Sequence, residues 1–376
     1  MNSLKDISSQ ARIRPWIINL VLVLLSTLIS FVVAEYIFRW AMFSGGPRFE
    51  NLRQPKLYTD RFSEDDFFKL KYLFTHRLSS TPEKPPHPLL GWKGKMLDEN
   101  LRHQDAGHIG QRRPVLLYGD SFAAGVGDAE SFQDILNRDE AFSRDYYLLN
   151  YGVSGFGVDQ IYLMLQHSLP LYQRPIVIFS LMTLDLDRSI LTFRGGAKPY
   201  FRVKDEALHL HGTPVALPPG AYIAENPPEI VSYLYRKSLF SGMMPESLRA
   251  CLRSKQQIVQ MKKQLNRKIL LAVLKLLDEQ QVDYCFLIFH PHFPGISTLD
   301  RESDWRDPFL RTFLDSTRVP HIWSKDLYRR DAGNSPPPFD QYIVPTHGHP
   351  TTRFNRIIAA EILRRIREID PGQGVP

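Results

Sequence analysis

The chain has 376 residues, of which 43% are hydrophobic and 23% are charged, and its net charge is +7. These proportions are those of a globular protein, so they exclude a disordered chain. Two cysteines, Cys251 and Cys285, are too few for a disulfide framework and leave the redox compartment undecided. The basic residues are scattered over helix-like stretches, which favours solvated helix faces over a nucleic-acid surface. We therefore expect no nucleic-acid partner.

An apolar segment near the N-terminus is the first element along the chain. Residues 16–34 are almost entirely apolar, and Ile37-Phe38 extends the stretch beyond Glu35. About 20 such residues are enough to span a bilayer. A cleaved signal peptide is the alternative, but the stretch is longer than the usual apolar region of such a peptide. The sequence therefore predicts a transmembrane anchor over residues 16–40.

Residues 41–113 differ in composition from the rest of the chain. They are rich in proline, aromatic and charged residues, and Thr81 to Pro88 form an extended, helix-breaking stretch. This pattern predicts a stalk and a lead-in to a folded domain over residues 114–376.

Short apolar runs alternate with amphipathic, helix-length segments in that domain. The runs are Val115 to Tyr118, Tyr147 to Asn150, Ile176 to Leu181, Tyr284 to Phe289 and His321 to Ser324. Strands that are nearly continuous in apolar residues are typical of parallel sheets covered by helices on both faces. The sequence therefore predicts an α/β fold with a flavodoxin-like, doubly wound parallel sheet of five strands.

An insertion at about residues 190–245 interrupts this alternation. Within it, Tyr200 to Val203 and Leu208 to Leu210 flank a turn and predict a hairpin. The aromatic and basic part from Phe193 to Val203 fits either a lid over the active site or a hairpin that only packs.

The run Gly119-Asp120-Ser121 follows the first predicted strand and opens a helix-like segment. The carboxyl edge of a parallel sheet is where such folds bind ligands, so Ser121 is a candidate nucleophile. An ordinary strand-to-helix turn, capped by Asp120 or Ser121, is the alternative.

With these residues the chain resembles the SGNH (GDSL-type) hydrolase superfamily from about Gly91 to its end. Leu116 to Phe122 is similar to the first family block, which carries the nucleophilic serine. Asn150 to Gly155 is similar to the second, which implies that the backbone N–H of Gly155 stabilises an oxyanion, together with that of Ser121.

The third family block departs from the pattern, because its oxyanion asparagine is missing, and the candidate substitutes are Thr183 or a water molecule. Membrane-anchored SGNH proteins carry an Asp-x-x-Arg stretch here and then Lys-Pro-x-Phe, similar to Asp185–Arg188 and Lys198–Phe201. Losing one oxyanion donor typically costs about a hundredfold or more in rate.

The fourth block is similar to His349-Pro350, which implies that His349 is the general base. The family's acid stands two or three residues earlier, where this chain has His347 and Thr346. Asp340 is the nearest upstream carboxylate and is the candidate acid; a Ser-His dyad without an acid is the alternative.

The resemblance implies a membrane-tethered serine esterase or O-acyltransferase that acts on acyl esters of a glycan or lipid through an acyl-serine intermediate. It places residues 1–15 in the cytoplasm and the domain on the extracytoplasmic, periplasmic side of the inner (plasma) membrane. The alternative is a catalytically degenerate binding or scaffolding protein of envelope polysaccharide assembly, as the missing asparagine and acid permit. Two His-x-His pairs, His290/His292 and His347/His349, could share a metal, but no carboxylate motif supports them, so we expect no metal and no cofactor.

Overall fold

The computed structural model describes residues 15–44, 46–75, 84–240, 255–290, 304–333 and 339–371. The chain divides into two compact units. The smaller comprises Met1–Thr59 and Glu229–Arg249, and the larger comprises Asp60–Pro228 and Ala250–Pro376.

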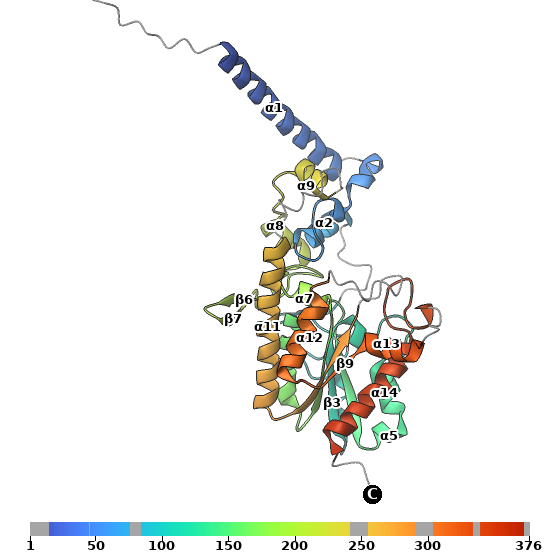
Figure 1. The fold of residues 1–376 in the computed structure, drawn as a ribbon. Helices are drawn as coiled ribbons and strands as arrows, with labels where there is room; N and C mark the ends of the chain where they lie inside the picture. Colours follow the sequence, from blue (N-terminus) through green and yellow to red (C-terminus); the bar gives the residue numbers. More distant parts are fainter. Residues whose placement is uncertain are drawn as a thin grey trace, which may run out of the picture. The chain divides into compact units, whose positions relative to one another are not determined.

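A parallel sheet forms the centre of the larger unit (Figure 1). Its strands are β3 (Arg113–Gly119), β4 (Tyr146–Gly152), β5 (Ile176–Met182), β8 (Asp283–Phe289) and β9 (His321–Trp323). Within the described residues they pair in the order β4-β3-β5-β8-β9, with every neighbouring pair parallel. This is the flavodoxin-like order of a doubly wound fold, and each strand overlaps one of the apolar runs, so the predicted fold class is confirmed.

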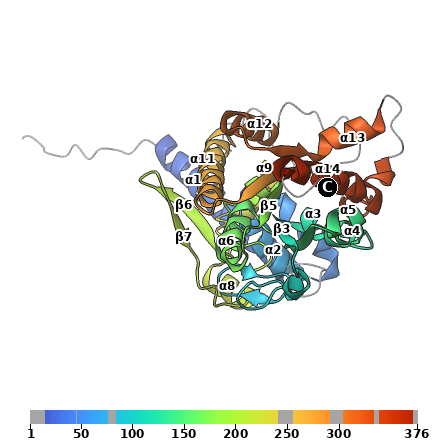
Figure 2. The ribbon, with the colours of Figure 1, turned by 90° about the horizontal axis from the view of Figure 1, so that it is seen from below.

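Helices cover both faces of this sheet, because its strands bury side chains on both sides. On β3, Leu116 and Tyr118 belong to one hydrophobic cluster, and Val115 and Leu117 belong to the other. The first cluster is completed by α6 (Val158–Ser168), α11 (Lys255–Glu279) and α12 (Arg306–Thr317). The second is completed by α4 (Phe132–Arg138), α13 (Ser324–Ala332) and α14 (Thr352–Ile369). Figure 2 shows α6 and α11 on the opposite side of the sheet from α4 and α14.

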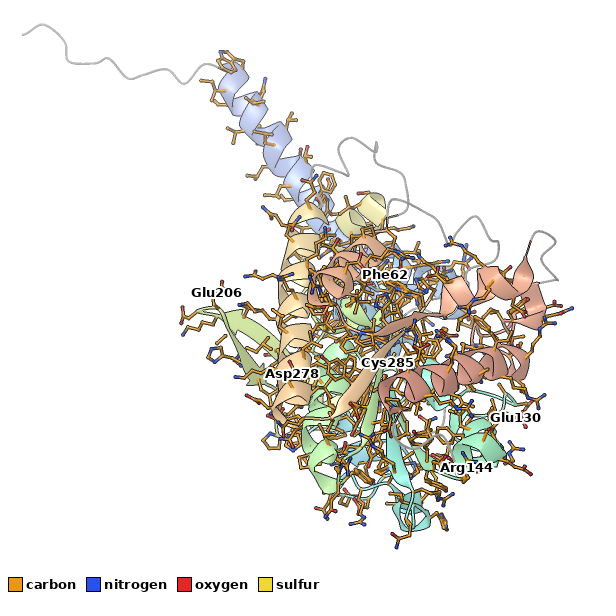
Figure 3. The ribbon with its side chains drawn as sticks, turned by 60° about the horizontal axis from the view of Figure 1, so that its bottom comes forward. Phe62, Glu130, Arg144, Glu206, Asp278 and Cys285 are labelled. Atoms are coloured by element: carbon orange, nitrogen blue, oxygen red, sulfur yellow. The ribbon has the colours of Figure 1, made fainter. Side chains whose placement is uncertain are left out.

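The remaining elements of the larger unit are short. They are α2 (Asp66–Thr75), α3 (Ser121–Ala124), α5 (Glu140–Ser143), α7 (Asp185–Arg188), α8 (Pro219–Glu225), the strand pair β1 (Pro86–His87) and β2 (Gly91–Trp92), and the 3-10 turns η3 (Gln104–His108), η4 (Leu169–Leu171) and η6 (Phe339–Gln341). Part of the lead-in packs on the sheet, since Trp92, Leu97 and Leu101 are buried in the first cluster. Cys285 lies buried in the middle of β8 (Figure 3), and this burial raises the pKa of its thiol to about 12.

The insertion contains the expected hairpin, β6 (Tyr200–Lys204) paired antiparallel with β7 (Ala207–His211). Its turn residue Glu206 lies at the tip (Figure 3) and forms an ion pair of 2.7 Å with Lys268 of α11. At the base, the fully buried Lys198 pairs with the equally buried Asp159 of α6. These contacts show that the hairpin packs against α6 and α11.

The smaller unit is built on α1 (Pro15–Phe43), which meets η1 (Pro47–Leu52), η2 (Pro55–Leu57) and α9 (Tyr233–Phe240). Within Trp16–Phe43, an 18-residue window of this helix has a mean hydropathy of 2.7, and by length and composition the helix could cross a membrane. Glu35 accepts hydrogen bonds from the backbone N–H groups of Tyr233 and Leu234 at 2.8 and 3.1 Å. Its carboxylate therefore occupies the place of a cap on the first turn of α9.

Candidate active site

Ser121 is placed at the carboxyl edge of the sheet by the turn between β3 and α3. Asp120 caps α3, because its Oδ1 accepts the backbone N–H of Phe122 at 2.8 Å. The turn needs a glycine at position 119, since a Cβ there would stand 2.1 Å from the Oγ of Ser180. The helix that opens at Ser121 is shorter than expected and ends at Ala124, before Gly125 with its φ of +74°.

His349 meets Ser121 from the loop before α14. Its Nε2 lies 2.8 Å from the Oγ of Ser121. The imidazole is half-buried and packs against the ring of Phe122, with 4.9 Å between ring centroids. The structure thus brings together the two residues that the resemblance names as nucleophile and base, although 228 positions separate them in the chain.

His347 stands where a triad would place its acid. Its Nδ1 lies 3.1 Å from the Nδ1 of His349 and also accepts the backbone N–H of His349 at 3.3 Å. In a hydrogen bond between the two Nδ1 atoms, one of them must donate a proton to the other. The Nδ1 of His347 already accepts the backbone N–H of His349, so it is the acceptor of the pair. The arrangement is satisfied when His349 carries its proton on Nδ1, which leaves Nε2 free to accept the proton of Ser121.

Asp340, the candidate acid, lies exposed in η6. Within the described part of the chain, no hydrogen bond or ion pair joins it to His349. His347 therefore holds the orientation of His349 in place of a carboxylate, and it does so without a negative charge.

Asp120 is the carboxylate beside the nucleophile. Its Oδ2 lies 3.4 Å from the Oγ of Ser121 and accepts from Arg188 of α7 at 2.9 Å. The same guanidinium nitrogen contacts Asp185 and the carbonyl of Phe156, the latter at 3.0 Å. Burial and the nearby Asp120 raise the pKa of Asp185 well above its usual range. The Asp-x-x-Arg stretch is thereby linked to the serine turn.

The pKa of His349 is lowered from its usual value. Burial is the main cause, and the nearby His347 and Arg188 add to it, while Asp120 opposes it. A histidine with a lowered pKa is unprotonated at neutral pH, which is the state that a general base requires.

Gly155 lies in the loop that follows β4, and its φ of +86° is in the left-handed region that favours glycine. Asn150 ties this loop to α3, since its Nδ2 donates to the carbonyl of Ala123 at 2.8 Å and its Oδ1 accepts from the N–H of Gly152 at 2.9 Å. Neighbouring Gly152 must be a glycine, because a Cβ there would come within 2.3 Å of the backbone nitrogen of Ala124. The loop is therefore held closely against the serine turn.

Thr183 follows β5 and is buried, and its backbone N–H donates to the carbonyl of Phe289 at 3.0 Å. Among the described residues, no hydrogen bond connects Thr183 with Ser121, Gly155 or His349. Its position at the sheet edge matches the third block, but it makes no contact with the reacting groups.

Two cations contact the Gly155 loop. The sequence did not indicate either of them. Lys84 donates to the carbonyl of Ser154, and Arg194 of the insertion donates to the carbonyl of Gly155. Trp92 also donates to the carbonyl of Ser154, at 3.1 Å. No motif marks these positions, because Lys84 lies within a proline-rich stretch and Arg194 precedes two glycines.

The histidine pairs do not form a metal site in the described residues. His290 Nε2 lies 2.9 Å from Asp307 Oδ1, and His292 lies outside the described residues. No group of three or more histidine, cysteine or acidic side chains suited to a metal occurs in the part of the chain that is described.

No family model and no curated protein matches the chain. Solved structures similar to it include a lipase/acylhydrolase from Enterococcus faecalis, with 13% identity, a TM-score of 0.37, and coverage of 70% of this chain and 100% of that chain. A catalytic mutant of an acetylxylan esterase from Geobacillus stearothermophilus has 14% identity, a TM-score of 0.34, and coverage of 69% and 95%. A GDSL-like lipase from Bacteroides thetaiotaomicron has 13% identity, a TM-score of 0.33, and coverage of 70% and 95%.

Similarities with identities and TM-scores this low do not assign an activity or site residues to this chain. Those assignments depend on the geometry of the chain itself. The order of the strands, the serine directly after β3 and the histidine directly before α14 are all present here. Together they give the chain the fold of an SGNH (GDSL-type) hydrolase.

Proposed function

We propose that the protein is a serine esterase or O-acyltransferase that acts on acyl esters of a glycan or lipid. The observation that carries the proposal is the 2.8 Å contact between Ser121 Oγ and His349 Nε2 at the carboxyl edge of the sheet. Such a contact is the minimum geometry for activating a serine hydroxyl with a neighbouring base.

In the proposed reaction, His349 takes the proton of Ser121 as Oγ attacks the ester carbonyl. The backbone N–H groups of Ser121 and Gly155 stabilise the oxygen that becomes negative. The tetrahedral intermediate then expels the alcohol, which receives the proton from His349. Water or a sugar hydroxyl attacks the acyl-Ser121 ester with the help of His349, which gives hydrolysis or acyl transfer.

The second candidate is a binding or scaffolding role in envelope polysaccharide assembly. The observation that favours it is the partner of His349, since His347 stands in place of the carboxylate whose negative charge stabilises an imidazolium in a triad. A fold can persist after its catalysis is lost, and such a protein would bind a glycan without turning it over.

Labelling with a serine-directed fluorophosphonate tests the first candidate. We expect the full chain to be labelled, Ser121→Ala not to be labelled, and His349→Ala to be labelled much more slowly, because the hydroxyl loses its base. Ser180→Ala is the matched control, since its buried hydroxyl only donates to the carbonyl of Tyr118. Absence of labelling together with no activity on short acyl esters would leave the binding role.

The location we propose is the inner (plasma) membrane, with α1 as a single-pass anchor, residues 1–15 in the cytoplasm and the larger unit on the extracytoplasmic side. An apolar helix of 28 residues supports the anchor, because about 20 residues are enough to cross the hydrocarbon core. Such a location would place the serine close to substrates that are made or displayed at the membrane.

A further inference from the structure

Lys84 and Arg194 place two positive charges against the same glycine. A Cβ on Gly155 would stand 2.6 Å from Arg194 Nη1 and 3.2 Å from Lys84 Nζ. Because both nitrogens lie so near one point, they are within about 6 Å of each other. Both residues keep part of their surface exposed.

Neither cation has a carboxylate partner among the described residues. Lys84 and Arg194 bond the carbonyls of Ser154 and Gly155, which are neutral acceptors. Other enclosed cations of the same unit are compensated. Those cations are Arg188 with Asp120 and Asp185, Lys198 with Asp159, and Lys262 with Asp187. The two cations at Gly155 therefore form a positive site beside the nucleophile that has no ion pair of its own, while Asp120 and Asp185 favour its charged form from a greater distance.

The protein tolerates this site at an electrostatic cost. Burial lowers the pKa of Lys84 to about 8, and the charges of Arg194 and Arg188 add to the effect, while Asp120 opposes it. Burial and the charge of Arg188 also lower the pKa of Arg194, to about 9. A bound anion would remove this repulsion, since it favours the charged form of both groups.

Aromatic rings hold the two cations in place. Lys84 Nζ lies 5.0 Å from the centroid of a Trp92 ring, and the Arg194 guanidinium lies 5.7 Å from that of Phe68. Cations fixed in this way lose little side-chain entropy when they bind a ligand, which is the advantage of a preformed site.

The peptide between Ser154 and Gly155 separates this site from the reacting carbonyl. In a trans peptide the C=O and the N–H point in opposite directions. Lys84 and Trp92 both contact the Ser154 oxygen, so they lie on the side away from the Gly155 N–H. The N–H is the group proposed to face the oxyanion, so Lys84 is placed for another part of the substrate.

We infer that Lys84 and Arg194 bind an anionic group carried by the ester substrate, and that the substrate class is an acylated acidic sugar. The inference rests on the proposed function, because the anion belongs to the molecule that Ser121 attacks. A carboxylate suits the site, since it can accept two bonds from a guanidinium and one from an ammonium group. A phosphate offers the same oxygen chemistry, so both anions are included in the test.

Binding to the full chain in detergent tests this inference without any turnover. The ligands are the methyl glycosides of glucuronic acid and of glucose, which differ only at C6, and the 6-phosphate of the latter. We expect the wild type to bind an anionic sugar at least tenfold more tightly than the neutral one in calorimetric titrations. Lys84→Gln and Arg194→Gln should each reduce this ratio of affinities about tenfold, because each variant loses one charge-assisted hydrogen bond to the anion.

Lys84→Arg and Arg194→Lys keep the charge and should retain most of the preference. Arg202→Gln is the matched control, because Arg202 is an exposed cation of the same insertion. Thermal unfolding of each variant shows whether the fold is intact. Comparing the uronic acid with the phosphate identifies the preferred anion, and both results agree with the inference.

Equal or undetectable binding of the charged and neutral sugars by the wild type would overturn the inference. A second result would also overturn the inference. If Lys84→Gln and Arg194→Gln lower kcat for acetylated glucose as much as for acetylated glucuronic acid, the two cations act on the reacting carbonyl and not on the anionic group. The proposed function fails separately, through absence of fluorophosphonate labelling, and the binding preference is measured whether or not Ser121 reacts.

Discussion

His347 performs one of the two roles of a triad acid, because it orients the imidazole of His349. Its Nδ1 contacts the Nδ1 of His349 at 3.1 Å and fixes the tautomer in which Nε2 faces Ser121. A carboxylate would do this and would also stabilise the imidazolium that forms in the transition state. An imidazole supplies no negative charge, and the proximity of His347 lowers the pKa of His349 instead.

The substitution His347→Asp should therefore increase kcat/KM on a short acyl ester by roughly tenfold or more. An aspartate Oδ1 lies at the same distance from the backbone as a histidine Nδ1, so the new carboxylate can reach His349. His347→Asn is the matched control, because it accepts the same hydrogen bond without a charge and should give no gain. Equal rates for the two variants would mean that the missing charge does not limit the reaction.

The pH dependence of kcat/KM should follow the protonation of His349. A base must be unprotonated, so the rate falls as pH drops through the pKa of His349 in the free enzyme. Burial lowers that pKa, so the acidic limb should have its midpoint below about 6.5, the usual histidine value. In His347→Asp the midpoint should move to higher pH. A limb that stays unchanged would indicate that another group controls the profile.

Lys198 and Asp159 act at the scale of elements, since they join the insertion to α6. Both side chains are completely buried, and Lys198 also donates to the carbonyls of Leu191 and Pro199 at 2.9 and 3.1 Å. Removing one partner of a buried pair leaves the other charge without compensation, which costs about 3–5 kcal/mol. The pair holds the start of β6, which follows Arg194, against α6, so it also supports the position of that cation.

Lys198→Met should accordingly lower the free energy of unfolding by about 3 kcal/mol or more in urea titrations of the full chain. The double variant Asp159→Leu/Lys198→Met should regain most of the loss, because neither charge remains buried alone. Lys204→Met is the control, since Lys204 is an exposed lysine of β6 and should change stability little. A double variant no more stable than Lys198→Met would contradict this account.

The sequence predicted the elements well where hydrophobic periodicity determines them. Each of the five strands and the long helices α6 and α14 fall on expected runs, because burial on both faces requires continuous apolar residues. The helix predicted after Ser121 is present as α3, which spans only Ser121–Ala124. Gly125 and Gly127, both with positive φ, follow it, and these glycines were visible in the sequence.

Contacts made by loops could not be predicted in the same way. The positions of Lys84 and Arg194 at Gly155 depend on how the lead-in and the insertion pack, and no local pattern encodes that packing. The same holds for His347, whose role follows from a distance and not from its residue type. The proposed nucleophile and base were recognisable because their neighbours, Gly119 and Pro350, belong to short local motifs.

At the scale of the whole molecule, α1 is the element that supports the proposed membrane location. Its side chains from Trp16 to Phe43 are largely exposed, as expected for an apolar helix that would be surrounded by lipid. Glu35 is the acidic residue of this helix, and it is satisfied by Arg39, Ser232 and the first turn of α9. An acidic group at this depth would be costly without such partners.

The full chain should therefore stay in the membrane pellet after alkaline carbonate extraction. Leu24→Arg/Leu25→Arg should release it, since each arginine at the centre of a span costs about 2.5–3.5 kcal/mol. Leu24→Ala/Leu25→Ala is the matched control and should remain in the pellet. Intact mass should show that residues 1–34 are retained; a mature protein that lacks them would identify a signal peptide instead.

The route of the chain between the two units affects how the protein could be shed. The chain crosses from one unit to the other three times, between Thr59 and Asp60, Pro228 and Glu229, and Arg249 and Ala250. Within the smaller unit, α9 is bound to α1 through Glu35 and the rings of Tyr58 and Tyr233, whose centroids are 5.4 Å apart. A protease that cuts once after η2 would leave the larger unit covalently joined to α9, and α9 would still be bound to α1. If α1 is the proposed anchor, release from the membrane would require further cuts or the loss of that helix contact, so a single nick would be a poor way to free the larger unit.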